Sequence, residues 1–144
     1  MGGREFEGID VSAQQAQIWI DDLERRLDWD KLRAFRFLTT ILRTLRDQLP
    51  LNEATDLGAQ LPTLIRGIYY DQWRPVHYIS VKDPTLPSFL DRIESDLEPE
   101  PIGDTSEAVS AVFGLLSEKI SVGEITNIRR SLPTAIRSLW PSTE

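Results

Sequence analysis

The stretch LPTLIRGIYY, residues 61–70, has a counterpart in LPTAIRSLWP, residues 132–141. When the surrounding residues 49–69 are laid over residues 120–140, the two segments are identical at seven positions, whereas unrelated segments of this length would share about one or two. The identical pairs are Glu53/Glu124, Thr55/Thr126, Leu61/Leu132, Pro62/Pro133, Thr63/Thr134, Ile65/Ile136 and Arg66/Arg137. This repetition predicts two copies of one structural unit.

Apolar side chains recur at steps of three and four residues along most of the chain, which is the spacing of one helix face. The expected helices cover residues 12–27, 30–49, 54–68, 89–97, 104–120 and 121–140. Four of them follow a residue suited to cap a first turn: Ser12, Asp30, Asp104 and Ser121. Pro62 either bends the third helix or starts a new one, whereas the sixth helix is expected to continue through Pro133 to Trp140. No segment is predicted to form a strand.

These helices divide into two predicted three-helix units, residues 12–70 and residues 86–140, joined by a connector at residues 71–85. A unit of about 55–60 residues would bury only a marginal core by itself. Phe37 and Ile41 add apolar surface to the middle helix of the first unit, beyond what a surface helix requires. We therefore predict an all-α fold with a single domain, residues 1–144. Its two pseudo-repeated units would form one six-helix bundle about a pseudo-twofold axis.

The chain is acidic, with 23 Asp and Glu residues against 16 Lys and Arg residues and a net charge of −7. A negative protein repels phosphate backbones and anionic lipids, which argues against nucleic acid and membrane partners. The absence of cysteine excludes disulfides and thiolate metal sites. The first residues lack a signal-peptide pattern, and no apolar run is long enough to cross a bilayer. These observations lead us to expect a cytoplasmic protein.

The sequence lacks local signatures of catalysis and cofactor binding. It contains no P-loop, dinucleotide glycine pattern, GxSxG elbow or HExxH motif. His77 is the only histidine, so only one side chain of the type that most often acts as a general base is present. A zinc site with nitrogen and sulfur ligands is disfavoured because the chain has one histidine and no cysteine. The carboxylates from Asp91 to Asp104 lack the ligand spacing of a calcium loop. We therefore predict no catalytic residue, metal ligand or cofactor, although a triad assembled from distant residues would escape this test.

Three segments of the chain resemble one known family. They are LRTLRDQLPLNEATDLGAQLPTLIRGIYYDQW at residues 42–73, FLDRI at residues 89–93 and GEITNIRRSLPTAIRSLWP at residues 123–141. Together they resemble the bacterial family called domain of unknown function 2267, and the resemblance covers most of the chain. It implies an all-helical bacterial protein, and it implies no activity because none is assigned to that family.

Arg66 and Arg137 are the repeated charges, and each stands three residues before an aromatic side chain, Tyr69 or Trp140. In one interpretation, each arginine packs along its aromatic neighbour and donates hydrogen bonds to carbonyl groups at a nearby helix end. In the other interpretation, the two arginines hold an anion between the units. The first interpretation makes the arginines structural, and the second makes them functional.

The aromatic residues that follow the first repeated segment are not required by the repeat. They are Tyr69, Tyr70, Trp73 and Tyr78. Trp73 is expected to pack between the two units, but these residues could instead form an exposed amphipathic patch for a partner. The candidate ligand-binding or partner-binding residues are therefore Arg66, Tyr69, Tyr70, Trp73, Arg137 and Trp140.

Two functions stay open at this point. The first is a non-enzymatic protein-interaction or regulatory module with a protein partner. The alternative is a binder of a small anionic metabolite, with or without enzymatic activity, that uses the repeated arginines and the aromatic connector. A partner-binding protein should present an apolar aromatic surface, whereas a metabolite binder should contain a hollow into which the arginines converge. The oligomeric state does not follow from the sequence.

Overall fold

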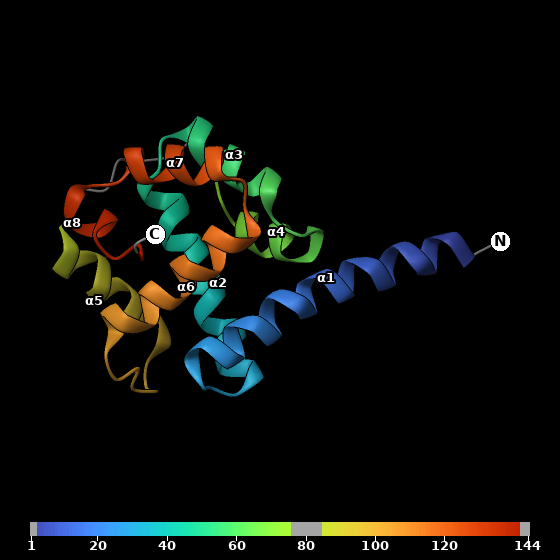
Figure 1. Ribbon diagram of the computed structural model, residues 1–144, viewed down its shortest axis with the longest axis horizontal. Coiled ribbons are helices and arrows are strands. Elements are labelled where there is room, and N and C mark those ends of the chain that lie inside the picture. The colour runs from blue at the N-terminus through green and yellow to red at the C-terminus, as the bar shows by residue number, and fades with distance from the viewer. Residues whose placement is uncertain (1–2, 76–84, 142–144) are drawn as a thin grey trace.

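The computed structural model describes residues 3–75 and 85–141, with side chains from residue 8 onward. These residues form eight helices and no strand, which confirms the all-α prediction (Figure 1). The helices are α1 (Gly3–Leu27), α2 (Lys31–Gln48), α3 (Leu51–Gln60), α4 (Thr63–Tyr70), α5 (Leu86–Leu97), α6 (Thr105–Lys119), α7 (Val122–Ser131) and α8 (Thr134–Arg137). Most of the connector, including His77 and Tyr78, lies outside the described residues.

Two prolines explain why the described residues contain more helices than the six expected. Pro62 precedes α4 with φ −56° and ψ 148°, and Pro133 precedes α8 with φ −55° and ψ 147°. Proline lacks the N–H that a continuing helix needs, and it disfavours helical geometry in the residue before it. Leu61 and Leu132 accordingly have extended backbones. Pro62 therefore starts a new helix, and the prediction of one continuous helix over residues 121–140 is wrong.

The first helix also differs from its prediction, because α1 begins at Gly3 and Ser12 lies inside it rather than at its cap. In the sequence, Phe6 and Ile9 continue the helical spacing of Ala13 and Ala16 toward the N-terminus. The apolar pattern thus begins before the capping signal, and the helix follows the pattern. The expected start at Ser12 is therefore corrected to Gly3.

The other three predicted caps are confirmed by side chains that accept hydrogen bonds from backbone N–H groups. Asp30 accepts from the N–H of Arg33 at 2.9 Å, and Asp104 accepts from that of Glu107 at 3.1 Å. Ser121 Oγ accepts from the N–H of Glu124 at 3.2 Å. Each bond satisfies one of the free donors at a helix start. These caps fix the starts of α2, α6 and α7.

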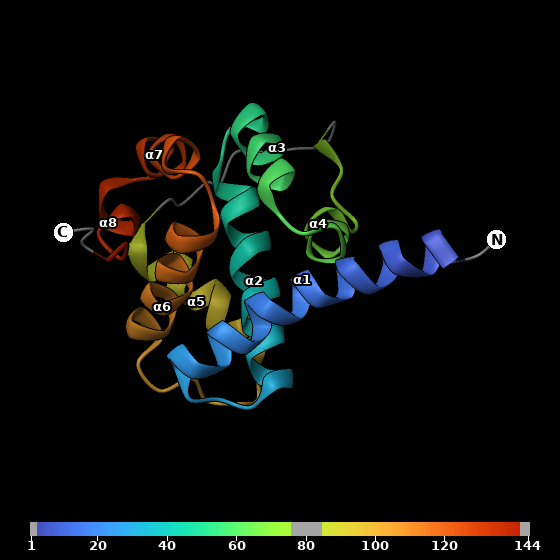
Figure 2. The same cartoon turned by 45° about the vertical axis from the view of Figure 1, so that its right-hand side comes forward.

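The core is organised around α2, which contacts α1, α3, α4, α5 and α6 (Figure 2). Phe37 and Ile41, the residues expected to widen its apolar face, are fully buried. It packs against α1, α3 and α4 from the first half of the chain and against α5 and α6 from the second half, and α1 also packs against α6. In addition, α3 packs against α7. The buried apolar residues from both halves of the chain therefore form one continuous cluster.

The N-terminal end of α1 extends past the other helices in both views (Figures 1 and 2). The C-terminal part of the helix is held by α2, α4 and α6. We call residues 8–14, which project from the body, the α1 arm. None of the helices in the described part of the chain is long and apolar enough to span a bilayer.

Candidate functional site

Arg66 reaches back from α4 to the end of α3. Its Nε donates to the carbonyl oxygen of Gly58 at 2.8 Å, and its Nη2 donates to those of Ala59 and Leu61 at 3.2 Å and 3.0 Å. The last carbonyl groups of a helix have no partner within the helix itself. The guanidinium of Arg66 therefore closes the C-terminal end of α3 and ties it to α4.

Arg137 repeats one of these contacts, because its Nη2 donates to the carbonyl oxygen of Leu132 at 3.1 Å. Its Nε is buried without a hydrogen-bond partner. Arg137 lines a small hollow of about 190 Å³ together with Thr126, Arg129 and Arg130. Arg66 lines a different hollow, of about 310 Å³, between α1 and the junction of α3 with α4. The two repeated arginines thus face separate concavities.

Tyr69 and Tyr70 join α4 to α3. Tyr69 is fully buried, and its hydroxyl donates to the carbonyl oxygen of Ala54 at 2.6 Å. Burial raises the pKa of Tyr69 well above its ordinary value, so the hydroxyl keeps its proton. The hydroxyl of Tyr70 donates to the carbonyl oxygen of Thr55 at 3.3 Å, and a Cβ on Gly58 would overlap the Tyr70 phenol. The two tyrosines therefore pin α4 along α3.

Trp73 follows α4 and stacks on Tyr70 with a centroid separation of 5.5 Å. Its indole Nε1 is buried and has no hydrogen-bond partner. The guanidinium of Arg46 lies 5.9 Å from the Trp73 ring and donates to the carbonyl oxygen of Tyr69 at 2.7 Å. Trp73 is thus packed against the end of α4 and the C-terminal part of α2.

Trp140 lies at a different place, next to α6. It is 5% exposed, stacks on Phe113 with centroids 3.9 Å apart, and donates from Nε1 to Ser117 Oγ at 2.6 Å. The six candidate residues therefore form two groups: Arg66, Tyr69, Tyr70 and Trp73 around α3 and α4, and Arg137 with Trp140 around α8 and α6. Their role in binding stays a prediction.

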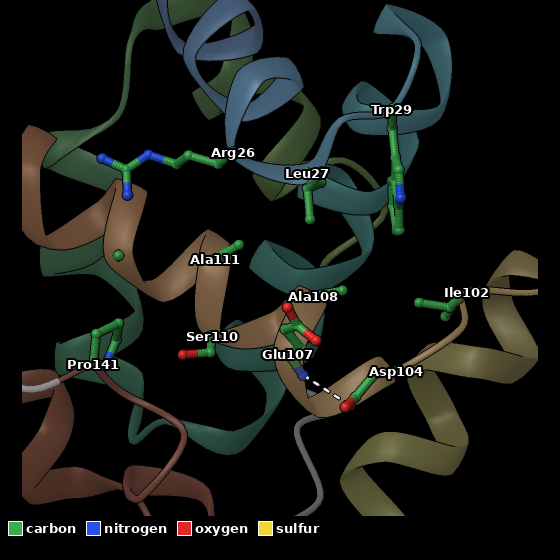
Figure 3. Close-up of a pocket in the computed structure, with 11 residues that line it drawn as sticks. Arg26, Leu27, Trp29, Ile102, Asp104, Glu107, Ala108, Ser110, Ala111 and Pro141 are labelled. Carbon is green, nitrogen blue, oxygen red and sulfur yellow. Dashed lines mark hydrogen bonds between the residues drawn. The ribbon is translucent and has the colours of Figure 1, made fainter.

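A larger hollow, of about 510 Å³, lies between the end of α1, α6 and Pro141 (Figure 3). Small side chains of α6 form part of its wall, including Ala108, Ala111 and Gly114. Arg26 at its edge is already paired with Asp22 and Glu118, and Asp104 caps α6. Within the part of the chain that the structure describes, no histidine, cysteine or lysine lines this hollow. Arg26 and Asp104 therefore already have structural contacts within the fold.

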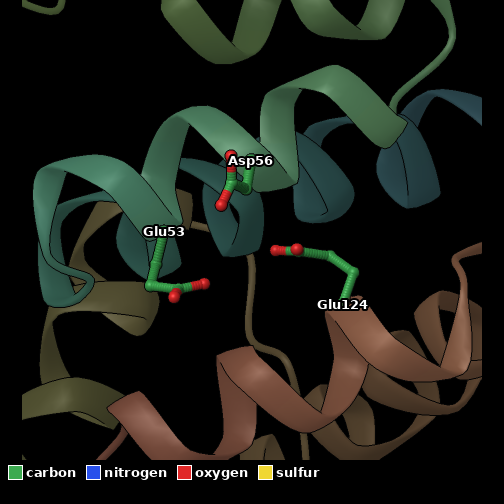
Figure 4. A group of neighbouring side chains, drawn as sticks. All are labelled: Glu53, Asp56 and Glu124. Carbon is green, nitrogen blue, oxygen red and sulfur yellow. The ribbon is translucent and has the colours of Figure 1, made fainter.

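Three carboxylates meet where α3 packs against α7 (Figure 4). Glu53 and Asp56 come from α3, and Glu124 comes from the first turn of α7. Each residue contributes one carboxylate oxygen that lies within 4.8 Å of those of the other two. Glu124 is 8% exposed, and Oε2 of both Glu53 and Glu124 is buried without a hydrogen-bond partner.

The electrostatic environment of Glu124 is unfavourable to a bare charge. Burial, together with the nearby charges of Glu53 and Asp56, raises the pKa of Glu124 from 4.5 to about 7. A buried carboxylate of this kind needs a proton or a cation to compensate its charge. At neutral pH a large share of the Glu124 carboxyl groups is therefore protonated, and a bound cation would favour the ionised form.

Sequence reasoning missed this cluster, because its members come from helices far apart along the chain. The carboxylates that stand out in the sequence are those at residues 91–104, where acidic groups are dense. A signal was nevertheless present, since the alignment of residues 49–69 with residues 120–140 pairs Glu53 with Glu124. The alignment does not predict that α3 and α7 pack against each other. The carboxylates come together only because these two helices are in contact.

The fold and these sites define a small all-helical protein built around one central helix. Residues 16–139 match the family described as "Uncharacterized conserved protein (DUF2267)". The chain therefore belongs to the DUF2267 family, and the resemblance seen in the sequence is confirmed. No curated protein matches the chain.

Proposed function

We propose that this protein is a non-enzymatic, cytoplasmic protein-interaction module that binds its partner along the α1 arm. The observation that carries the proposal is an apolar stripe that runs past the body of the protein. Leu23 is fully buried and Ile20 is 6% exposed, Ala16 is half-buried, and Ala13 and Ile9 on the arm are exposed. These residues follow one another at steps of three and four and so share one face of α1. The face that builds the core thus continues into solvent.

The α1 arm and the helical turn that follows it carry more exposed apolar surface than this stripe alone. Ile9 is 63% exposed, and Val11 is 51% exposed. Ile18, one heptad after Val11 on the same side of the helix, is 55% exposed. Apolar side chains gathered on a projecting element are typical of a surface that a partner covers. A helix that is exposed on several sides would also gain stability from such a partner.

The partner that fits best is an amphipathic helix with basic residues beside its apolar seam. The steps of three and four are those of a helix–helix seam, and Ala13 and Ala16 allow close approach. Asp10 is exposed and lies beside the seam, at a position where a partner's Lys or Arg could pair with it. A second copy of the chain would bring another Asp10 and another net charge of −7 to the contact. Charge therefore favours a basic partner over self-association.

Site-specific photo-crosslinking in the native host tests this proposal. We expect p-benzoylphenylalanine in place of Ile9 to give one discrete adduct with another protein, because the arm would lie within the contact. The same group in place of Asp96, an exposed residue of α5, serves as the control and should not give that adduct. Mass spectrometry should map the adduct to a helix with flanking Lys or Arg residues.

Two results would contradict the docking proposal. Adducts at twice the mass of the chain would assign the arm to self-association. Adducts that are the same at positions 9 and 96 would mean that the arm has no partner of its own. Replacement of Ala13 by Glu, which places a charge in the seam, should remove a true adduct without unfolding the protein, since Ala13 is exposed.

We also propose that the chain consists of two copies of one helical unit. Pro62 and Pro133 have nearly the same backbone angles at the starts of α4 and α8. Arg66 and Arg137 each donate to a carbonyl five residues earlier, at Leu61 and Leu132 respectively. Sequence identity and contact geometry therefore support the same pairing, and α3 packing on α7 would bring equivalent helices together across the pseudo-twofold axis.

A second candidate function is the binding of a small anion, and the hollow beside Arg137 favours it. Three arginines, Arg129, Arg130 and Arg137, line that hollow with Thr126. Arg137 Nε is a buried donor with no partner, and such donors are costly unless something accepts from them. Guanidinium groups in this number suit a phosphate or carboxylate. Arg66 does not share the hollow, so the expected pair of converging arginines is replaced in this proposal by a cluster around Arg137.

Thermal unfolding of Arg66→Gln and Arg137→Gln separates these roles. We expect Arg66→Gln to lower stability by about 1–2 kcal/mol, because three carbonyl contacts at the end of α3 are lost. Arg137→Gln should cost less, because it removes one such bond. Arg74→Gln, at an exposed position, is the control for loss of charge.

The same melts, repeated in sulfate and phosphate at constant ionic strength, test the anion site. We expect no specific protection of the wild type if Arg137 has only a structural role. Protection that disappears in Arg137→Gln but persists in Arg66→Gln and Arg74→Gln would establish an anion site and promote the second candidate function.

A further inference from the structure

We propose that Glu53, Asp56 and Glu124 bind a hard divalent cation between α3 and α7. The distances between the three carboxylate groups are short enough for one ion. Oxygen ligands lie about 2.4 Å from Ca²⁺, so two oxygens on one ion can be at most about 4.8 Å apart. One oxygen from each of the three residues satisfies this limit with respect to the other two. The three side chains need no large rearrangement to share one ion.

The second support is the state of the Glu124 side chain, which is more than nine-tenths buried and points into the cluster (Figure 4). Its Oε2 has no hydrogen-bond partner, and the same holds for Oε2 of Glu53. Among the residues that the structure describes, no Lys or Arg forms an ion pair with any of the three carboxylates. Buried carboxylates without a basic partner are typical of groups that coordinate metals.

The local backbone explains how these acidic groups are placed together. Glu53 and Asp56 are three residues apart on α3 and so lie on one face of that helix. Glu53 and Glu124 both occupy the first turns of their helices, where the positive end of the helix dipole favours negative charge. The packing of α3 against α7 then turns the two faces toward each other.

The chemistry of the donors selects the class of ion. All three are carboxylates, which suit the hard cations Ca²⁺, Mg²⁺ and Mn²⁺, and the cluster contains no nitrogen or sulfur donor that would favour a softer metal. Bound water would complete the coordination shell. Because the ligands come from both α3 and α7, the ion would join the two halves of the chain. This inference does not depend on the proposed partner of the α1 arm.

Cation titration of the full-length chain tests the site. Protein treated with EDTA and then dialysed is titrated with CaCl2, MgCl2 or MnCl2 at pH 8, with NaCl added to hold ionic strength constant. We expect a saturable single-site isotherm for at least one cation by calorimetry, together with a higher melting temperature that EDTA reverses. Absence of saturable binding by all three cations in the wild type would overturn the proposal.

Three variants and one control assign the binding to these residues. Glu53→Gln, Asp56→Asn and Glu124→Gln should each weaken the cation affinity at least about tenfold, since each removes one anionic ligand. Asp96→Asn removes the same charge on an exposed part of α5 and should leave the affinity unchanged. Equal weakening in all four variants would mean diffuse attraction by the acidic surface and would overturn the proposal.

Loss of binding through misfolding can be recognised. Each variant removes charge repulsion within the cluster, so its basal melting temperature should equal or exceed that of the wild type in EDTA. A variant that keeps its helical signal and melts cooperatively, yet no longer responds to the cation, supports the site. A variant of this kind that still responds as the wild type does would remove its residue from the proposed ligand set.

Discussion

Residues 1–80 and residues 81–144, prepared as separate fragments, are each expected to lack a cooperative unfolding transition. The first fragment would contain α1 to α4 and would expose the side of α2 that packs against α5 and α6. The second would contain α5 to α8 and would lose α2, the helix that packs against α5, which carries the buried residues Phe89 and Ile93. A fragment of about 60–80 residues has little apolar surface in reserve to offset the entropy of ordering its backbone.

Circular dichroism and thermal melts of the two fragments measure this effect. Each fragment alone should show reduced helicity and a broad, non-cooperative melt, whereas the intact chain should melt in one transition. The equimolar mixture is the control, because recovery of helicity on mixing would show that the fragments are intact and lack only each other. Cooperative melting of either fragment alone would instead mean two independent domains and would contradict the predicted single domain.

The helices could be predicted because their signals are local. The apolar stripe of α2 and the caps at Asp30, Asp104 and Ser121 each depend on residues within one or two turns, and the structure contains them as expected. The break at Pro133 was also available from local rules, but the apolar spacing on both sides of the proline favoured one continuous helix. At Pro133 the missing backbone N–H ended the helix even though the apolar spacing continued beyond it.

The candidate site was less predictable, because it depends on which helices pack together. The sequence indicated that Arg66 and Arg137 are equivalent. In the structure, however, the guanidinium of Arg66 binds the end of α3, whereas Arg137 lines a hollow together with Arg129 and Arg130. The apolar face of α1 could be recognised in the sequence from Ala16 onward. The local sequence does not predict which part of that face the other helices cover. The contact of α3 with α7, which creates the carboxylate cluster, is a tertiary contact of the same kind. Periodicity predicts that a face is apolar, and tertiary packing decides what covers it.

Glu124→Gln is expected to stabilise the protein at pH 8 by up to about 3 kcal/mol when divalent cations are removed with EDTA. The pKa of Glu124 is raised from 4.5 to about 7 by burial and by the charges of Glu53 and Asp56. Above pH 7 the wild type must hold this carboxylate ionised inside the fold, whereas the unfolded chain holds it in water. Glutamine has nearly the same shape and no charge, so the variant avoids that cost.

The pH dependence follows from the direction of the shift. A folded-state pKa above the unfolded value means that the folded protein binds the proton more tightly, so the contribution of Glu124 to stability falls as pH rises from about 4.5 to about 7. Below pH 4.5 both states are protonated, and the wild type and the variant should differ little. Urea unfolding of both proteins at pH 4 and pH 8 measures the difference, and other titrating groups cancel in the comparison.

Asp22→Asn is the matched control, because it removes the same charge with the opposite expected sign. Burial alone would raise the pKa of Asp22, but hydrogen bonds from Arg26 and Lys119 outweigh burial and lower it. Neutralising Asp22 should therefore destabilise the protein at pH 8, since the two cations lose a partner that is itself mostly buried. If Glu124→Gln also destabilised the protein at pH 8 in EDTA, favourable contacts would have to stabilise the Glu124 carboxylate, and repulsion from Glu53 and Asp56 would not be the dominant effect. That result would mean that the buried charge at the contact of α3 with α7 is already compensated within the chain.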